Sequence, residues 1–132
     1  DDNHDMEPIG AVLNDSFGGY VVIRAPKLEY GAIMQALEKG HFYFSMGPRI
    51  EEAYIRDGKL VVRTSPVKKI YVRQKGRDCY RKAAGRGGQI TEAQFDLTGK
   101  EGYVRVDICD ENGRHAGTNA LWLDEVLADM WR

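Results

Sequence analysis

The chain has 132 residues, with 19 basic and 20 acidic side chains and a formal net charge of -1. A near-neutral chain is not drawn over long distances to nucleic acid or to an anionic membrane, so we expect neither as a partner. No stretch approaches the roughly 18 apolar residues of a membrane helix, and 42% apolar residues are enough to bury a core. Two widely spaced cysteines, Cys79 and Cys109, fit reduced thiols, and we expect a cytoplasmic globular protein.

The first third of the chain predicts a loop, a strand and a helix. After a polar opening, residues 18–25 form a short β-branched run, and Pro26 ends it. From Leu28 to Lys39 apolar residues recur at helical spacing, and Gly40 follows where a helix often ends. We expect these two elements either to pack on the rest of the chain or to expose an apolar surface.

After Gly47-Pro48 the pattern changes to alternation of apolar and polar residues, interrupted by turn residues. Ser65-Pro66 is expected to end one strand, and Asp57-Gly58 predicts a tight hairpin turn. The predicted strands are residues 50–56, 59–64, 67–74, 79–83, 91–97, 103–109 and 119–123. About seven short antiparallel strands predict a mainly β protein with an immunoglobulin-like β-sandwich.

The N-terminus carries the metal signature of the sequence. Asp2 and His4 place a carboxylate and an imidazole close together, and both groups bind divalent metals. Because the pair stands at the start of the chain, further ligands would have to come from sequence before residue 1. We therefore expect the chain to be a piece of a larger protein.

Two motifs follow each other in the sequence: Asp2-x-His4, and the segment Ala36-Leu37-Glu38-Lys39-Gly40-His41-Phe42-Tyr43-Phe44-Ser45-Met46-Gly47-Pro48. Together they resemble the C-terminal portion of PHP-type metal-dependent phosphoesterases. In that family an Asp-x-His supplies metal ligands, and a similar segment links the barrel to a β-rich extension. The resemblance continues faintly through Tyr103-Val104-Arg105-Val106, whereas Ala116-Gly117-Thr118-Asn119-Ala120 keeps only the alanine and asparagine of the family's Ala-Trp-x-Asn-Pro.

The resemblance implies a parent enzyme that hydrolyses phosphate esters with water activated by divalent metal ions, Zn, Mn or Fe. Asp2 and His4 would be metal ligands, and Asp1 and Asp5 would orient the imidazole. Since a catalytic metal needs about three protein ligands, we expect this chain alone to bind no metal stably and to be inactive. The implied partners are the upstream barrel of the same polypeptide and a phosphate-ester substrate, and a homodimer is a further option.

These features divide the chain into three parts. The resemblance implies that residues 1–48 are the terminal loop, strand and helix of a PHP-type barrel plus a linker, a strand-helix remnant of that barrel. Residues 49–125 are the C-terminal β-sandwich, and residues 126–132 form a short helical tail. The alternative function is a binding or interaction module, in which the sandwich recognises a polymer, a carbohydrate or a protein.

A local basic region lies between Lys68 and Arg86, where Asp78 is the only carboxylate. Tyr71 and Tyr80 stand among the cations, and aromatic residues among cations are typical of polyanion-binding surfaces. Alternating charges on a strand are more commonly a solvated face that blocks edge pairing. The candidate polyanion contacts are Lys69, Arg73 and Arg81.

Overall fold

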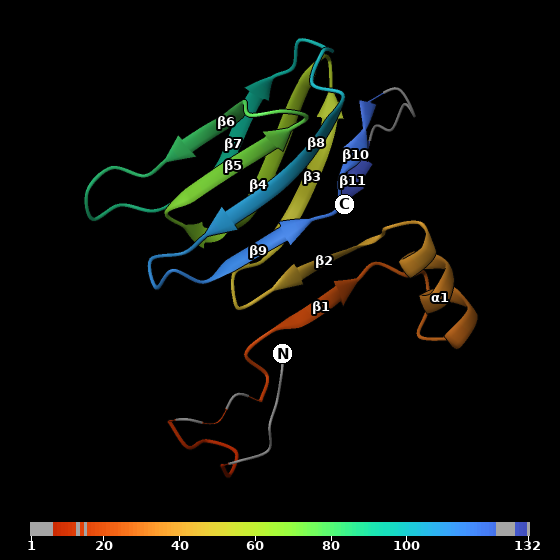
Figure 1. Ribbon diagram of the computed structural model, residues 1–132, viewed down its shortest axis with the longest axis vertical. Coiled ribbons are helices and arrows are strands. Elements are labelled where there is room, and N and C mark those ends of the chain that lie inside the picture. Colours follow the sequence, from red (N-terminus) through yellow and green to blue (C-terminus); the bar gives the residue numbers. More distant parts are fainter. Residues whose placement is uncertain (1–6, 13, 15, 124–128, 132) are drawn as a thin grey trace.

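The computed structural model describes residues 7–12, 14, 16–123 and 129–131. Two antiparallel sheets pack face to face, and the predicted β-sandwich is confirmed (Figure 1). Within the described ranges, no helix has the length and apolar character that crossing a membrane requires.

Among the described residues, the larger sheet has seven strands and the smaller sheet has four. The larger sheet has the order β1 (Tyr20–Ile23), β2 (Phe42–Ser45), β9 (His115–Thr118), β8 (Tyr103–Cys109), β5 (Lys69–Gln74) and β6 (Cys79–Ala83), with β10 (Leu121–Trp122) beside β8. The smaller sheet has the order β11 (Asp129–Trp131), β3 (Ile50–Arg56), β4 (Lys59–Val67) and β7 (Ile90–Asp96). The helix α1 (Tyr30–Glu38) lies between β1 and β2 in the chain.

Alternating apolar residues build the core between the two sheets. In β5, Ile70 and Val72 are fully buried and lie opposite Ile108 and Val106 of β8. The smaller sheet contributes the buried residues Ile50, Ala53, Leu60, Val62, Val67, Ala93 and Phe95. β4, β5 and β7 therefore bury the residues of one face and leave the other face more exposed, as alternation predicts.

The strands from β3 to β9 are divided between the sheets as in immunoglobulin-like sandwiches. β3, β4 and β7 lie in one sheet, and β9, β8, β5 and β6 lie in the other. The β3–β4 hairpin turns at Asp57 and Gly58, whose φ angles of 51° and 72° suit a tight two-residue turn. The predicted bounds of β3, β6 and β8 are confirmed.

The prediction that β4 ends before Ser65-Pro66 was wrong. β4 continues to Val67, and its register against β7 shifts between Arg63 and Val67. Pro66 lies inside this shift, where no ladder partner is assigned to it. Its missing N–H group therefore costs no strand hydrogen bond, which is why a proline is tolerated here.

The end of the chain differs from the prediction in two ways. The last predicted strand, residues 119–123, is reduced to β10, and the strand β9 precedes it. Residues 129–131, expected in a helical tail, form β11 and pair with the edge of β3. The open backbone groups of an edge strand favour such pairing over a helix. Residues 126–128 and 132 of the predicted tail lie outside the described residues.

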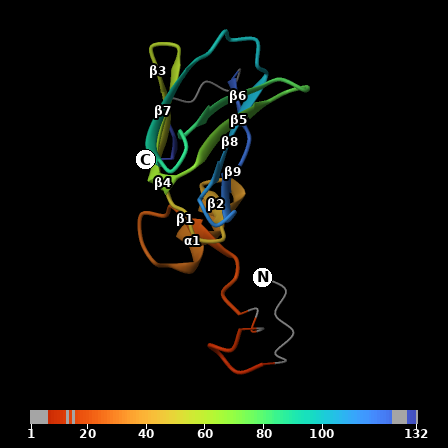
Figure 2. The ribbon, with the colours of Figure 1, turned by 90° about the vertical axis from the view of Figure 1, so that its left-hand side faces the viewer.

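β1 and β2 form one edge of the larger sheet, and α1 lies next to β1, as Figures 1 and 2 show. β2 pairs with β9 through Tyr43–Thr118 and Phe44–Gly117, and β1 pairs with β2. The predicted linker therefore contains a strand, β2. The larger sheet includes strands from both sides of residue 48, which is the predicted boundary between the barrel part and the sandwich. Asn119 strengthens the junction, because its side-chain amide donates hydrogen bonds to the carbonyls of Gly40 and Phe42, both at 3.1 Å.

Candidate functional site

The predicted metal ligands lie outside the described residues. This holds for Asp2 and His4 and for the two carboxylates, Asp1 and Asp5, expected to orient the imidazole. In the part of the chain that the structure describes, no group of three or more His, Cys, Asp or Glu side chains could hold a metal ion. The donor types of Asp2 and His4 suit a divalent cation, and the metal site stays a prediction.

The outer face of the larger sheet brings together the three predicted polyanion contacts. Lys69 and Arg73 stand on either side of Tyr71 in β5, and Tyr71 lies opposite Arg81 of β6. Residues two apart in a strand, and residues opposite each other in paired strands, share one face. Lys69, Arg73 and Arg81 are all exposed, so the sheet presents three cations around one tyrosine.

Asp107 of β8 holds two arginines on this face. Its Oδ2 atom accepts hydrogen bonds from Nε of Arg73 and, at 3.1 Å, from Nη2 of Arg105. Asp107 is 8% exposed, whereas the side chains of Arg73 and Arg105 are 54% and 42% exposed. The hydrogen bond to Asp107 raises the pKa of Arg73, and the guanidinium lies 5.9 Å from the centre of the Tyr71 ring. Both guanidinium groups are therefore held in place while part of each side chain stays open to solvent.

We call this surface the cationic face, and it consists of Lys69, Tyr71, Arg73, Arg81, Arg105 and Asp107. Sequence reasoning missed Arg105 and Asp107. Both residues occupy outward-facing positions in the alternation of β8, and this alternation is visible in the sequence. The pairing of β8 with β5, which places them beside Arg73, cannot be read from periodicity.

A row of side chains extends the cationic face across the sheet. The register aligns Phe44, Gly117, Asp107, Tyr71 and Arg81 on β2, β9, β8, β5 and β6. A Cβ atom on Gly117 would lie 2.5 Å from Oδ1 of Asp107 and 2.6 Å from Cε1 of Phe44. The phenyl ring and the carboxylate therefore close over Gly117, and only glycine fits between them.

A buried carboxylate organises the loop between β7 and β8. Glu101 is 2% exposed, and its Oε1 atom accepts hydrogen bonds from the Tyr80 hydroxyl at 2.8 Å, the Thr98 amide at 2.6 Å and the Thr98 hydroxyl at 2.9 Å. Burial raises the pKa of Glu101, but these donors and its own backbone N–H outweigh burial and lower it to about 2. Glu101 is therefore ionised at neutral pH and acts as an anchor for the loop.

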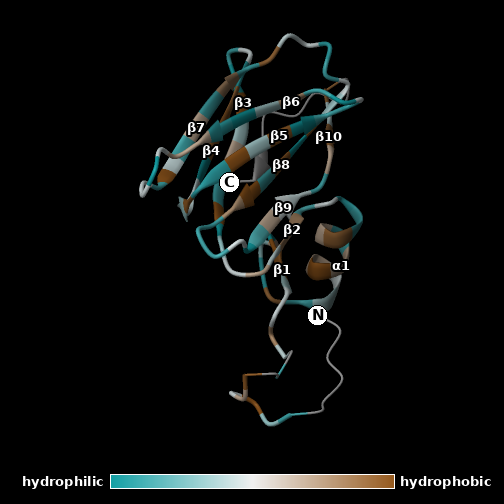
Figure 3. Ribbon diagram, turned by 60° about the vertical axis from the view of Figure 1, so that its left-hand side comes forward, coloured by the Kyte–Doolittle hydropathy of each residue, from teal (hydrophilic) through white to brown (hydrophobic). Residues whose placement is uncertain are grey.

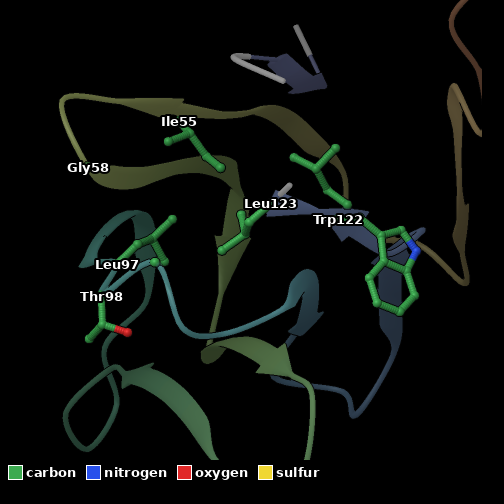
Figure 4. A pocket seen from close by; sticks show the side chains of 8 residues that line it. Ile55, Gly58, Leu97, Thr98, Trp122 and Leu123 are labelled. Carbon is green, nitrogen blue, oxygen red and sulfur yellow. The ribbon is translucent and has the colours of Figure 1, made fainter. Parts of the chain in front are cut away.

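An apolar hollow of about 400 Å³ opens at one end of the sandwich (Figure 4). Ile55 of β3, Leu97 after β7 and Leu123 after β10 point toward one another in it, and Trp122 lies to one side. The remaining lining residues are Gly58, Thr98, Gly99 and Leu121. No titratable side chain is among these lining residues, so the hollow suits apolar contact and not acid–base chemistry.

A second apolar hollow, of about 310 Å³, lies beside β1 and α1. It is lined by Val21, Ile23, Ala25, Lys27, Leu28 and Ile33. Of these residues Leu28 is 93% exposed, and Tyr30, the first residue of α1, is 82% exposed. Figure 3 shows hydrophobic segments on α1 and β1 in this region. We call the residues that line this hollow, together with Tyr30, the N-terminal apolar surface.

The described residues thus offer fixed positive charge on the larger sheet and apolar contact at two other places. Comparisons of the chain with protein-family models, curated proteins and solved structures found no match. The interpretation of its function therefore rests on its own residues.

Proposed function

We propose that this chain is the C-terminal part of a PHP-type metal-dependent phosphoesterase. In this proposal residues 1–48 belong to the catalytic barrel and its link, and the sandwich is a non-catalytic extension. The observation that carries the proposal is the N-terminal apolar surface. It lies on the strand and helix that lead into residues 36–48, the segment that resembles the family's link between barrel and extension.

The N-terminal apolar surface has the character of a protein-packing surface. Leu28, Tyr30 and Val21 are 93%, 82% and 51% exposed, and large apolar side chains gathered in one place are typical of protein contacts. β1 pairs with β2 along one edge only within the described part of the chain, so its other edge can accept a further strand. A barrel of the same polypeptide would cover the apolar side chains and pair with that edge.

The junction with the sandwich gives this arrangement a defined geometry. β2 is hydrogen-bonded to β9. Asn119 comes directly after β9, and its side chain donates hydrogen bonds to the carbonyls of Gly40 and Phe42. A barrel packed on β1 and α1 would therefore have a fixed position relative to the sandwich. The extension in this proposal supports the orientation of the catalytic part.

The chemistry would take place at the start of the chain. Asp2 and His4 would each donate one ligand to a divalent metal site, and Asp1 and Asp5 would hold the imidazole in the ligating orientation. With a divalent ion held by these residues, the site would supply water activated for attack and positive charge to neutralise the phosphate ester. Because two donors do not complete such a site, the other ligands would come from the barrel.

The test compares this chain with the parent protein extended before residue 1. We expect only the longer protein to retain metal after dialysis and to hydrolyse a phosphodiester or a phosphomonoester. Asp2→Ala and His4→Ala in the longer protein should lose both metal and activity. His115→Ala, at an exposed histidine of β9, is the matched control and should keep both.

A second readout follows the N-terminal apolar surface directly. Amide hydrogen exchange of residues 20–38 should be slower in the longer protein than in this chain, because the barrel would cover β1 and α1. A folded longer protein without metal, without hydrolysis and without added protection of these amides would show that the proposal is wrong.

A further inference from the structure

We propose that the cationic face binds single-stranded nucleic acid. The residues that make the contact are Lys69, Tyr71 and Arg73 of β5, Arg81 of β6 and Arg105 of β8. This surface belongs to the sandwich, and the inference does not depend on the proposed metal chemistry or on a barrel. The net charge of the whole chain is -1, and it does not reveal this surface because the charges are unevenly distributed.

Charge is the first reason. On the cationic face, four cations stand with Asp107, and its carboxylate is already engaged by Arg73 and Arg105. Lys69 and Arg81 have no side-chain hydrogen-bond or salt-bridge partner among the described residues. Such cations keep their full electrostatic attraction for a ligand, and a polyanion is the ligand whose charge is complementary.

Pre-organisation is the second reason. Asp107 is 8% exposed and holds the guanidinium groups of Arg73 and Arg105, so their side chains lose little conformational freedom when a phosphate binds. The Phe44 ring and the Asp107 carboxylate both lie close over Gly117, and Asp107 is itself buried. A merely solvated row of lysines and arginines would have no such support.

Aromatic rings among the cations are the third reason, and they favour nucleic acid over other polyanions. Tyr71 is half-buried and lies between Lys69 and Arg73, and the Arg73 guanidinium lies over its ring. Phe44 is 44% exposed in the same row. Aromatic rings and guanidinium planes stack on bases, while neighbouring cations contact phosphates.

The shape of the face favours a single strand over a duplex. The row from Phe44 to Arg81 crosses β2, β9, β8, β5 and β6, a distance of about 19 Å at ~4.8 Å per strand. This length suits a few extended nucleotides. In a duplex the bases are stacked within the helix and cannot stack on aromatic side chains of a sheet face.

The experiment measures fluorescence anisotropy of a labelled oligonucleotide of about 12 nucleotides, a length within the usual site size, titrated with the full 132-residue chain. At physiological salt we expect a dissociation constant of about 10⁻⁴ to 10⁻⁶ M, and tighter binding at low salt. With about three phosphates neutralised, the logarithm of affinity should fall with the logarithm of salt concentration with a slope of about -2. The duplex of the same sequence should bind more weakly.

Variants of the cationic face separate its contributions. Lys69→Gln and Arg81→Gln should each reduce the magnitude of the salt slope by about 0.7, because each removes one phosphate contact. Tyr71→Leu keeps apolar cover on the sheet but removes the stacking ring, and it should weaken binding about tenfold. Arg63→Gln is the matched control, because Arg63 is exposed on β4 of the other sheet and should leave binding unchanged.

Three results would overturn the inference. The first is no binding at low salt. The second is an oligonucleotide affinity that Lys69→Gln and Arg81→Gln leave unchanged. The third is a sulfated polysaccharide that displaces the oligonucleotide as well as unlabelled oligonucleotide does, together with no effect of Tyr71→Leu. This third result would identify a general polyanion surface without recognition of bases. Thermal unfolding of each variant shows that the fold is retained.

Discussion

Replacing Gly117 with alanine tests the row of side chains that crosses the larger sheet. The φ angle of Gly117 is outside the left-handed region, so alanine can adopt this backbone. Without a steric conflict the substitution should stabilise the fold by about 0.4–1 kcal/mol, because it restricts the unfolded chain. The new methyl group, however, would lie 2.5 Å from Oδ1 of Asp107 and 2.6 and 2.9 Å from Cε1 and Cζ of Phe44. Favourable contacts between carbon atoms lie at about 3.5–4.0 Å.

Two groups can yield to the methyl group, and both movements cost free energy. The Phe44 ring is 44% exposed and can turn toward solvent, which gives up its packing over Gly117. The Asp107 carboxylate is 8% exposed, and its movement would strain the hydrogen bonds from Arg73 and Arg105. Overpacking of this kind costs about 1–3 kcal/mol. After the gain in the unfolded chain is subtracted, we expect a net destabilisation of about 1–2 kcal/mol.

The measurement is urea and thermal unfolding of the Gly117→Ala variant. A loss of about 1–2 kcal/mol corresponds to a decrease in Tm of roughly 3–8 °C for a chain of this size. In a Phe44→Ala background the cost of Gly117→Ala should be smaller, because the ring is absent. Gly31→Ala is the control, since nothing lies within 4 Å of a Cβ at Gly31 and its φ is not left-handed. This control should be neutral or stabilising by up to about 1 kcal/mol.

The sign of the change in stability decides the outcome. A Gly117→Ala variant as stable as the wild type, or more stable, would refute the inference that Phe44 and Asp107 close over Gly117. A cost that the Phe44→Ala background leaves unchanged would refute the part of the reasoning that concerns the ring.

Two further predictions concern the loop after β7 and the junction at Asn119. Hydrogen bonds lower the pKa of Glu101 from 4.5 to about 2, so its stabilisation is fully present above pH 4.5 and is lost as pH falls toward 2. Glu101→Gln should therefore lower the free energy of unfolding at neutral pH. It should also make the free energy of unfolding fall less steeply between pH 4.5 and 2. An unchanged slope in this pH range would contradict the stabilising role of the Glu101 carboxylate. Asn119→Ala removes the donors to the Gly40 and Phe42 carbonyls and should cost about 1–3 kcal/mol in urea unfolding. In this variant amide hydrogen exchange should accelerate more in β2 than in β5. An equal acceleration in both strands would argue against a role of Asn119 at the junction.

Some strands of this protein could be predicted because their signals are local. β3, β6 and β8 begin and end at the predicted residues, and Asp57-Gly58 forms the predicted turn. Alternation and turn chemistry depend on neighbouring residues only. β9 was not predicted because it contains Gly117, a residue that weakens a strand pattern. The reason for that glycine lies on two other strands, in Phe44 and Asp107.

The cationic face likewise contains some residues that could be predicted from the sequence and others that could not. Lys69, Arg73 and Arg81 could be selected from the sequence because they share an outward parity along two adjacent predicted strands. Arg105 and Asp107 could not be added, because Asp107 lies 34 residues from Arg73 in the chain. Their contact depends on the pairing of β5 with β8, in which Arg73 lies opposite Arg105.

The amino-acid sequence by itself determined the mainly β class, the inward and outward faces of most strands, the hairpin at Asp57-Gly58 and the composition of the basic stretch. These properties follow from side-chain alternation and from backbone preferences, which act over a few residues. The tertiary structure decided the order of strands in the two sheets, the addition of β1 and β2 to the larger sheet, and the contact of Asp107 with Arg73 and Arg105. Strand order is chosen by burying all the apolar faces together, and this burial depends on the whole chain at once.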